Sequence, residues 1–206
     1  MNEITPVALL LLGVIVAVSL WAFSVYRGGR PVAQFLFIPS EVAQGRHLGG
    51  LLLSQFAHAD IAHLVFNGLT LFWFGPAVEL ALGPGGLAAI YAASAAGSTL
   101  LTFAAHHKDR AYSALGASGA ISGVLFAAIV LEPGMSISLG IVPIYVPAPL
   151  FAVGYIVVSI LAARRRADNI GHEAHLGGAI TGLLLAGQLS GDGFRPLIER
   201  LTHLFR

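Results

Sequence analysis

The sequence contains no cysteine and few charged residues. Of its 206 residues, 10% are Asp, Glu, Lys or Arg, whereas about a quarter of an average soluble domain is charged. So little charge cannot coat a water-facing surface, which argues against a soluble globular protein. The absence of cysteine excludes a disulfide framework and thiol chemistry, and it leaves the redox compartment open. The formal net charge of +1 gives no indication of a nucleic-acid partner.

Hydrophobic residues dominate the chain instead. They make up 56% of it, and the mean hydropathy is +0.82. A helix needs about 20 apolar residues to cross about 30 Å of hydrocarbon, and six stretches meet or nearly meet that length. The sequence therefore predicts an all-α, polytopic membrane protein in a lipid bilayer, with one domain over residues 1–206. The predicted spans are residues 6–26, 59–82, 86–105, 117–132, 147–163 and 172–190.

Three segments need a separate assignment, because their type is not given by length and hydropathy alone. The first apolar run is expected to be a retained span, because the residues before it carry Glu3 and no Lys or Arg, and no small-residue cleavage site follows it. Residues 31–56 are only partly polar and predict an insertion that lies against the membrane. Residues 192–206 predict an interfacial helix, since apolar residues at helical spacing are interleaved with arginines. The apolar positions are Phe194, Leu197, Ile198, Leu201 and Leu204, and the arginines are Arg195, Arg200 and Arg206.

Polar groups gather at the start of three predicted spans. Ionisable groups inside a membrane are costly, so each is a functional candidate. The second, fourth and sixth spans cross in the same direction, which puts their first residues at a similar depth on one side. The pattern therefore predicts a site built from all three spans. The candidates are His58, Asp60, His63 and Asn67 in the second span, Ser118 in the fourth, and His172, Glu173 and His175 in the sixth.

His63 and Asn67 are four residues apart and share one helix face. They are candidates for holding a ligand or a reacting group. The alternative is that they only form hydrogen bonds between packed helices. The pair alone does not decide between the two.

Ser118 lies in the sequence Gly116-Ala117-Ser118-Gly119, where a loop meets a helix. Free N–H groups at a helix start can stabilise an oxyanion. Gly119-x-x-x-Gly123 and Gly178-x-x-x-Gly182 form small-residue faces through which parallel helices can touch closely. Aligning these faces places Ser118 and His175 within about 3 Å in depth at about 1.5 Å rise per residue. A serine and a histidine at that separation could form an activated nucleophile.

His172-Glu173-x-His175 is one residue shorter than the zinc-protease signature H-E-x-x-H. A metal site here would need a further ligand from His58 or His63. We expect no metal and no cofactor.

Taken together, these residues resemble the rhomboid family of intramembrane proteases, over most of the chain from His58 to Gly182. Gly75, Glu79 and Gly83 also look like the family pattern at the end of the second span. The motifs that carry the resemblance are His58-x-x-x-x-His63-x-x-Phe66-Asn67, Gly116-Ala117-Ser118-Gly119, and Ala174-His175-x-x-Gly178-x-x-x-Gly182.

The resemblance implies a six-helix rhomboid-like bundle that acts as a serine endopeptidase on transmembrane segments of other proteins. Ser118 would be the nucleophile and His175 its general base, without a carboxylate. His63, Asn67 and the backbone N–H of Ser118 would hold the oxyanion, and residues 31–56 would form the family's membrane-embedded loop. We expect a multi-pass protein of a bacterial-type inner or plasma membrane.

The sequence departs from the family at two places. The family often has a Trp-Arg pair where this chain has Gly49 and Gly50, and an aromatic residue where it has Ser122. We therefore expect looser support for the entry loop and for His175, with every catalytic group still present.

Membrane orientation is left open by the sequence. The resemblance implies a cytoplasmic N terminus and an outward-facing site, and the basic tail helix agrees with it. The loops on the site's side nevertheless carry eight of the 11 Lys and Arg residues, which favours the opposite orientation. Those eight are Arg27, Arg30, Arg46, Lys108, Arg110, Arg164, Arg165 and Arg166.

Two other functions remain as alternatives. A rhomboid-like protein could bind transmembrane segments without cutting them, although such proteins usually lack the serine or the histidine. A transporter or channel would suit six spans, but the sequence shows no repeated half with broken helices.

Overall fold

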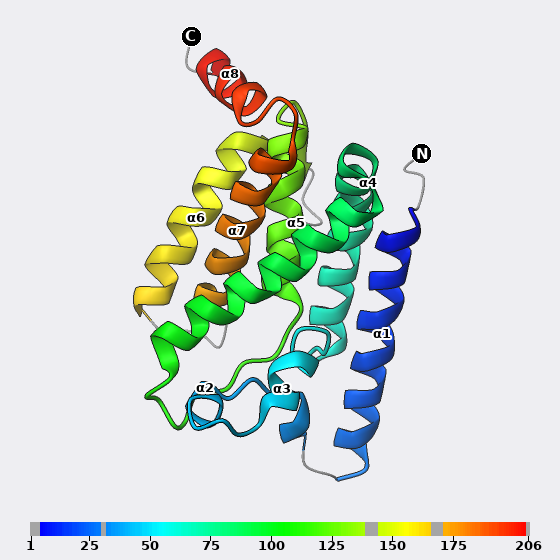
Figure 1. Cartoon of the computed structure of the whole chain (residues 1–206), viewed down its shortest axis with the longest axis vertical. Coiled ribbons are helices and arrows are strands. Elements are labelled where there is room, and N and C mark those ends of the chain that lie inside the picture. The colour runs from blue at the N-terminus through cyan, green and yellow to red at the C-terminus, as the bar shows by residue number, and fades with distance from the viewer. Residues whose placement is uncertain (1–4, 30–31, 139–143, 166–170, 205–206) are drawn as a thin grey trace.

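The computed structural model describes residues 5–29, 32–138, 144–165 and 171–204. Within them the chain is mostly helical, which confirms the predicted polytopic helical membrane fold (Figure 1). A two-stranded antiparallel hairpin, which the sequence reading did not predict, joins the fourth and fifth predicted spans. The elements in order are α1 (Pro6–Arg27), η1 (Ala33–Phe35), α2 (Pro39–Val42), α3 (Leu48–Leu53), α4 (Ile61–His106), α5 (Ser118–Leu131), β1 (Ser136–Ser138), β2 (Tyr145–Pro147), α6 (Ala148–Arg165), α7 (His172–Leu189) and α8 (Arg195–Leu204).

Helix α4 contains two of the predicted spans. It runs for 46 residues, and its backbone leaves helical geometry at Gly83, where φ is +76°. Glycine adopts this left-handed conformation without the penalty that a Cβ would impose. Figure 1 shows the two arms of α4 meeting at a sharp corner. By length and hydropathy alone, α1 and α4 qualify as membrane-spanning among the described helices. The count of six spans and the single-domain assignment stay predictions.

Helix α5 is the centre of the bundle. Every residue from Gly119 to Val130 is buried, and α5 packs against both α4 and α7. A helix that is apolar on all sides is stable only when other segments surround it. Helix α5 is 14 residues long.

The insertion before α4 forms three short helical pieces, η1, α2 and α3, at one end of the bundle (Figure 1). Phe37 and Ala114 exchange backbone hydrogen bonds of 2.8 and 2.9 Å, and the Gly116 N–H donates to the Ser54 carbonyl at 3.0 Å. These bonds tie the insertion to the segment that leads into α5. They therefore fix the approach to Ser118.

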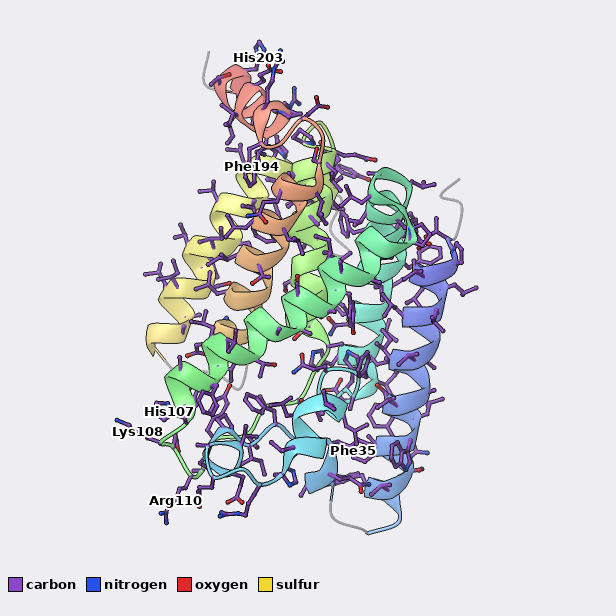
Figure 2. The ribbon with its side chains drawn as sticks, in the orientation of Figure 1. Phe35, His107, Lys108, Arg110, Phe194 and His203 are labelled. Carbon is purple, nitrogen blue, oxygen red and sulfur yellow. The ribbon has the colours of Figure 1, made fainter. Side chains whose placement is uncertain are left out.

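Helix α8 lies at the opposite end, where Figure 2 labels Phe194 and His203, far from Lys108 and Arg110. The ring of Phe194 packs on Gly187 and leaves no room there for a Cβ. The predicted tail helix is thus present from Arg195 to Leu204. The position of α8 at the membrane interface stays a prediction. Three of the arginines that bear on membrane orientation lie outside the described residues, namely Arg30, Arg166 and Arg206.

Glu79 holds the start of α1 to the first arm of α4. Its buried carboxyl group accepts hydrogen bonds from the Thr5 hydroxyl and from the Val7 and Ala8 N–H groups, at 3.0 and 2.8 Å for the two N–H groups. The first N–H groups of a helix have no partner within the helix, and a carboxylate there also interacts favourably with the helix dipole. Glu79 thus accepts hydrogen bonds from N–H and O–H groups that lipid hydrocarbon could not satisfy.

Replacing Glu79 with alanine leaves these donors without an acceptor. Since hydrogen bonds to a charged group contribute about 1.5–3 kcal/mol each, we expect Glu79→Ala to lower the free energy of unfolding by about 3 kcal/mol or more. Unfolding in detergent measures this, with Glu199→Ala on the exposed face of α8 as the control. Equal stability of the two variants would contradict the assignment.

Candidate active site

Ser118 and His175 form a direct contact where α5 and α7 begin. The Ser118 hydroxyl lies 2.7 Å from Nε2 of His175. Ser118 is the first residue of α5, and His175 lies in the first turn of α7. The polar starts of the fourth and sixth predicted spans therefore meet at one depth, as their spacing requires.

Glycine packing brings the two helices together. A Cβ on Gly178 would overlap the Gly119 carbonyl oxygen, and a Cβ on Gly182 would overlap that of Gly123. The backbones of α5 and α7 therefore touch directly, through the two Gly-x-x-x-Gly faces. The hydroxyl side chain of Ser98 on α4 occupies the space beside Gly119 on another side. This three-way contact sets the separation between Ser118 and His175.

His63 lies beside the same site. The Asp60 carboxylate accepts a 2.8 Å hydrogen bond from the His63 N–H and so caps the start of α4. A Cβ on Gly116 would lie 2.9 Å from Cε1 of His63 and 3.4 Å from the Ser118 hydroxyl. Gly116 has φ of +146°, a conformation that favours glycine. Its missing side chain leaves room for the His63 ring next to Ser118.

Asn67 is buried one turn after His63 and donates a 3.0 Å hydrogen bond to the His63 carbonyl. His58 is buried behind His63, with its ring perpendicular to the His63 ring at 5.0 Å, and Nδ1 of His58 lies 2.9 Å from the Ser19 hydroxyl of α1. His58 therefore connects Ser19 of α1 to the His63 ring.

The site opens into a large cavity of about 2150 Å³. Ser118 and His175 lie in its wall, together with His63 and Asn67. The first arm of α4 contributes Trp73 and other apolar residues, and α6 contributes residues on a further wall. The cavity extends to the β1–β2 hairpin at the other end of α5.

Tyr155 is a site residue that sequence reasoning missed. It projects from α6, its hydroxyl lies 2.7 Å from the Ser122 hydroxyl, and its ring lies 6.4 Å from the His175 ring. The sequence predicts looser support for His175, because Ser122 replaces an aromatic residue of the family pattern. In the structure an aromatic ring from another helix lies beside His175. The available signal was a tyrosine in the middle of an apolar span.

Gly50 also has a local explanation. A Cβ at this position would overlap the Leu36 carbonyl and lie 2.7 Å from the His47 ring. The His47 ring in turn lies 2.7 Å from the Ala33 carbonyl. The glycine allows α3 and η1 to pack closely, so the entry loop is compact at this departure from the family pattern.

The His172 ring lies 6.3 Å from the His175 ring, at 84°, whereas Glu173 pairs with α4. Glu173 lies 3.4 Å from Nε2 of His106 at the end of α4, and the His106 ring stacks on Tyr112. This pairing ties the start of α7 to α4 at the cavity mouth. Burial and the Glu173 carboxylate raise the pKa of Tyr112 to about 12, so its hydroxyl stays neutral. Among the described residues no group of three or more His, Asp or Glu side chains could hold a metal ion.

Comparison with known proteins identifies the family to which this chain belongs. The family profile described as the rhomboid domain matches residues 45–191, which include every residue of the site. The chain is a member of the rhomboid family. The rhomboid family acts within the bilayer on transmembrane substrates.

Several named proteins are similar to this rhomboid. RHOMBOID-like protein 12, mitochondrial, of Arabidopsis thaliana is 29% identical over 163 residues, which cover 70% of this chain and 47% of that protein. Presenilin-associated rhomboid-like protein, mitochondrial, of Homo sapiens is 30% identical over 139 residues, or 65% and 36% of the two chains. Rhomboid protein 1, mitochondrial, of Saccharomyces cerevisiae is 30% identical over 142 residues, or 66% and 40%. This rhomboid thus matches less than half the length of each of these relatives.

These relatives correct one expectation. The predicted bacterial-type inner or plasma membrane is wrong, because the relatives are named as mitochondrial proteins and point to a mitochondrial membrane. Hydropathy indicates that a chain needs a bilayer, but the same apolar spans suit bilayers of many compartments. The residues alone could not identify the organelle.

The α5–α7 contact predicts different effects for two glycine substitutions. Gly178→Ala forces the helices apart, and overpacking of this kind destabilises a protein by about 1–3 kcal/mol. We expect it to lower the unfolding temperature and to separate Ser118 from His175. The matched control is Gly154→Ala on α6, where a Cβ meets nothing within 4 Å. Thermal unfolding compares them, and a Gly178→Ala variant as stable as the control would contradict the backbone contact.

Proposed function

We propose that this rhomboid is a serine endopeptidase that cleaves transmembrane segments of other proteins, with Ser118 as nucleophile and His175 as general base. The 2.7 Å contact between Oγ of Ser118 and Nε2 of His175 is the observation that carries the proposal. A serine hydroxyl is a weak nucleophile until a base within hydrogen-bond distance takes its proton. Neutral His175, unprotonated at Nε2, accepts that hydrogen bond.

The reaction proceeds in two stages. Oγ of Ser118 attacks the carbonyl carbon of the substrate peptide bond, and its proton moves to His175. The C–N bond then breaks, His175 gives the proton to the leaving amine, and the acyl group stays as an ester on Ser118. Water next gives a proton to His175 and attacks the ester. The new carboxylic acid leaves as Ser118 regains its proton from His175.

The developing oxyanion needs hydrogen-bond donors. The N–H of Ser118 is available for this role, because the first N–H groups of a helix have no partner within it. The His63 ring next to Gly116 and the Asn67 side chain supply two further donors, and both line the cavity. Asn67 reaches the oxyanion by turning its amide from the His63 carbonyl, since apo geometry often tightens only in the complex.

The cavity suits an apolar, helical substrate. Its α4 wall carries Phe66 and Trp73, whose side chains are 67% and 55% exposed, and its α6 wall carries Phe151. Large exposed apolar side chains beside a polar centre fit a transmembrane segment better than a water-soluble peptide. The polar residues at the mouth give water a route to Ser118.

A rhomboid-like binding protein without catalysis is the second candidate. Retention of Ser118 and His175 in hydrogen-bond contact favours the enzyme, since a binding protein has no use for an activated hydroxyl. Cleavage of a bound transmembrane segment identifies a protease, and binding without cleavage identifies a binding protein.

Removal of either member of the dyad abolishes cleavage. We expect Ser118→Ala and His175→Ala each to reduce kcat by at least about 1,000-fold, because members of such a unit act together. Cleavage of a generic transmembrane substrate measures this, and labelling by a serine-directed fluorophosphonate gives a second readout. Ser24→Ala, on the exposed side of α1, is the control and keeps both cleavage and labelling. Labelling that persists in Ser118→Ala would overturn the proposal.

Loss of an oxyanion donor has a smaller effect. Removing one such donor reduces kcat by about 100–1,000-fold in a serine protease, so we expect Asn67→Ala to fall in that range with KM little changed. Steady-state kinetics on the same substrate separates the two constants. Ser24→Ala, on the exposed side of α1 and away from the cavity, is again the control. An unchanged kcat in Asn67→Ala would leave Asn67 with only a packing role.

A further inference from the structure

Tyr155 connects three helices at the depth of the site. Its hydroxyl lies 2.7 Å from the Ser122 hydroxyl on α5. Its ring lies 5.3 Å from the Phe126 ring, at 61°, and 6.4 Å from the His175 ring of α7, at 37°. One side chain of α6 therefore contacts both the helix of the nucleophile and the proposed base.

The position of Ser122 makes the contact specific. Ser122 lies four residues after Ser118, so the two hydroxyls are on the same face of α5, one turn apart. Tyr155 is thus anchored directly below the nucleophile. Its neighbours on α6, Val153 and Val157, are exposed at 54% and 49% and point away from the bundle. Tyr155 faces inward, into the wall of the cavity.

The imidazole of His175 needs such a support. A hydrogen bond to Ser118 holds Nε2, but rotation of the ring about χ2 breaks that bond, and this torsion has a broad energy minimum. An aromatic ring packed beside the imidazole restricts the rotation. The Ser122 hydrogen bond, in turn, fixes the Tyr155 ring. These contacts connect Ser122 of α5, through Tyr155, to His175, the proposed base for Ser118.

We propose that Tyr155 is a positioning residue that holds the imidazole of His175 in line with Ser118, while Ser122 holds the tyrosine. The proposal rests on the proposed function of Ser118 and His175. The ring does the positioning, and the hydroxyl pair fixes the ring. Loss of the ring therefore slows the chemical step without weakening substrate binding.

The test uses four variants of the full chain. Tyr155→Leu removes the ring, Tyr155→Phe keeps it without the hydroxyl, and Ser122→Ala removes the hydroxyl partner. Val157→Ala, on the exposed face of the same helix, is the control. The readouts are the rate of fluorophosphonate labelling, kcat and KM on a transmembrane substrate, and the unfolding temperature.

We expect Tyr155→Leu to reduce kcat and the labelling rate at least about tenfold with KM within about twofold, because only an interaction specific to the chemical step is lost. Tyr155→Phe restores most of both rates. Ser122→Ala and Tyr155→Phe reduce kcat by equal small factors, and the double variant falls no further, since both remove one interaction. The control matches the wild type.

The outcomes separate the two proposals. A wild-type chain that is not labelled at Ser118 overturns the proposed function. A labelled wild type with an unchanged rate in Tyr155→Leu, or with a change in KM alone, overturns the role of Tyr155 only. If Tyr155→Leu shows no unfolding transition, and so does not fold, the variants Tyr155→Phe and Ser122→Ala test the proposal instead. Non-additive losses in kcat then support the proposal, and wild-type kcat in both single variants contradicts it.

Discussion

Direct contact between the backbones of α5 and α7 is the constraint on which the site depends. A Cβ on Gly178 or Gly182 would overlap the carbonyl of Gly119 or Gly123, so the two backbones touch only because these positions are glycine. At that distance the starts of the two helices project Ser118 and His175 toward each other. Any larger residue at the crossing would open a gap between the two groups. Hydrocarbon offers no hydrophobic drive for helix association, so close packing of this kind is what holds membrane helices together.

The other elements hold this pair in a defined environment. Glu79 anchors α1 to the first arm of α4, and His58 extends the connection from α1 to His63. The insertion before α4 pairs with the segment around Ala114 and fixes the turn at Gly116. These polar contacts are enclosed by protein, which is the arrangement that a bilayer requires. The site itself faces the cavity of about 2150 Å³.

Much of this arrangement could be predicted from the sequence because it depends on spacing along single helices. The predicted spans begin and end within a few residues of α1, α4, α5, α6 and α7. The four-residue spacing of His63 and Asn67, and the two glycine pairs, are local features that a helix converts directly into shared faces. Membership of the rhomboid family, which the motifs indicated, is confirmed by the profile match.

The features that were missed depend on contacts between distant segments. Tyr155 reaches Ser122 and His175 only through the rotation of α6 about its axis, which an apolar helix does not encode in its own pattern. The role of Gly50 depends on the Leu36 carbonyl at the end of η1. The hairpin depends on pairing between β1 and β2. The membrane compartment was predicted wrongly, since apolar composition is shared by spans of every bilayer.

An experimental structure of the protein after reaction with a serine-directed fluorophosphonate tests the site most directly. We expect phosphorus to be bonded to Oγ of Ser118. We also expect the phosphoryl oxygen to point toward His63, Asn67 and the Ser118 N–H, with the His175 ring still packed beside Tyr155. A phosphorus atom on any other residue, or α5 and α7 too far apart for His175 to reach Ser118, would contradict this expectation.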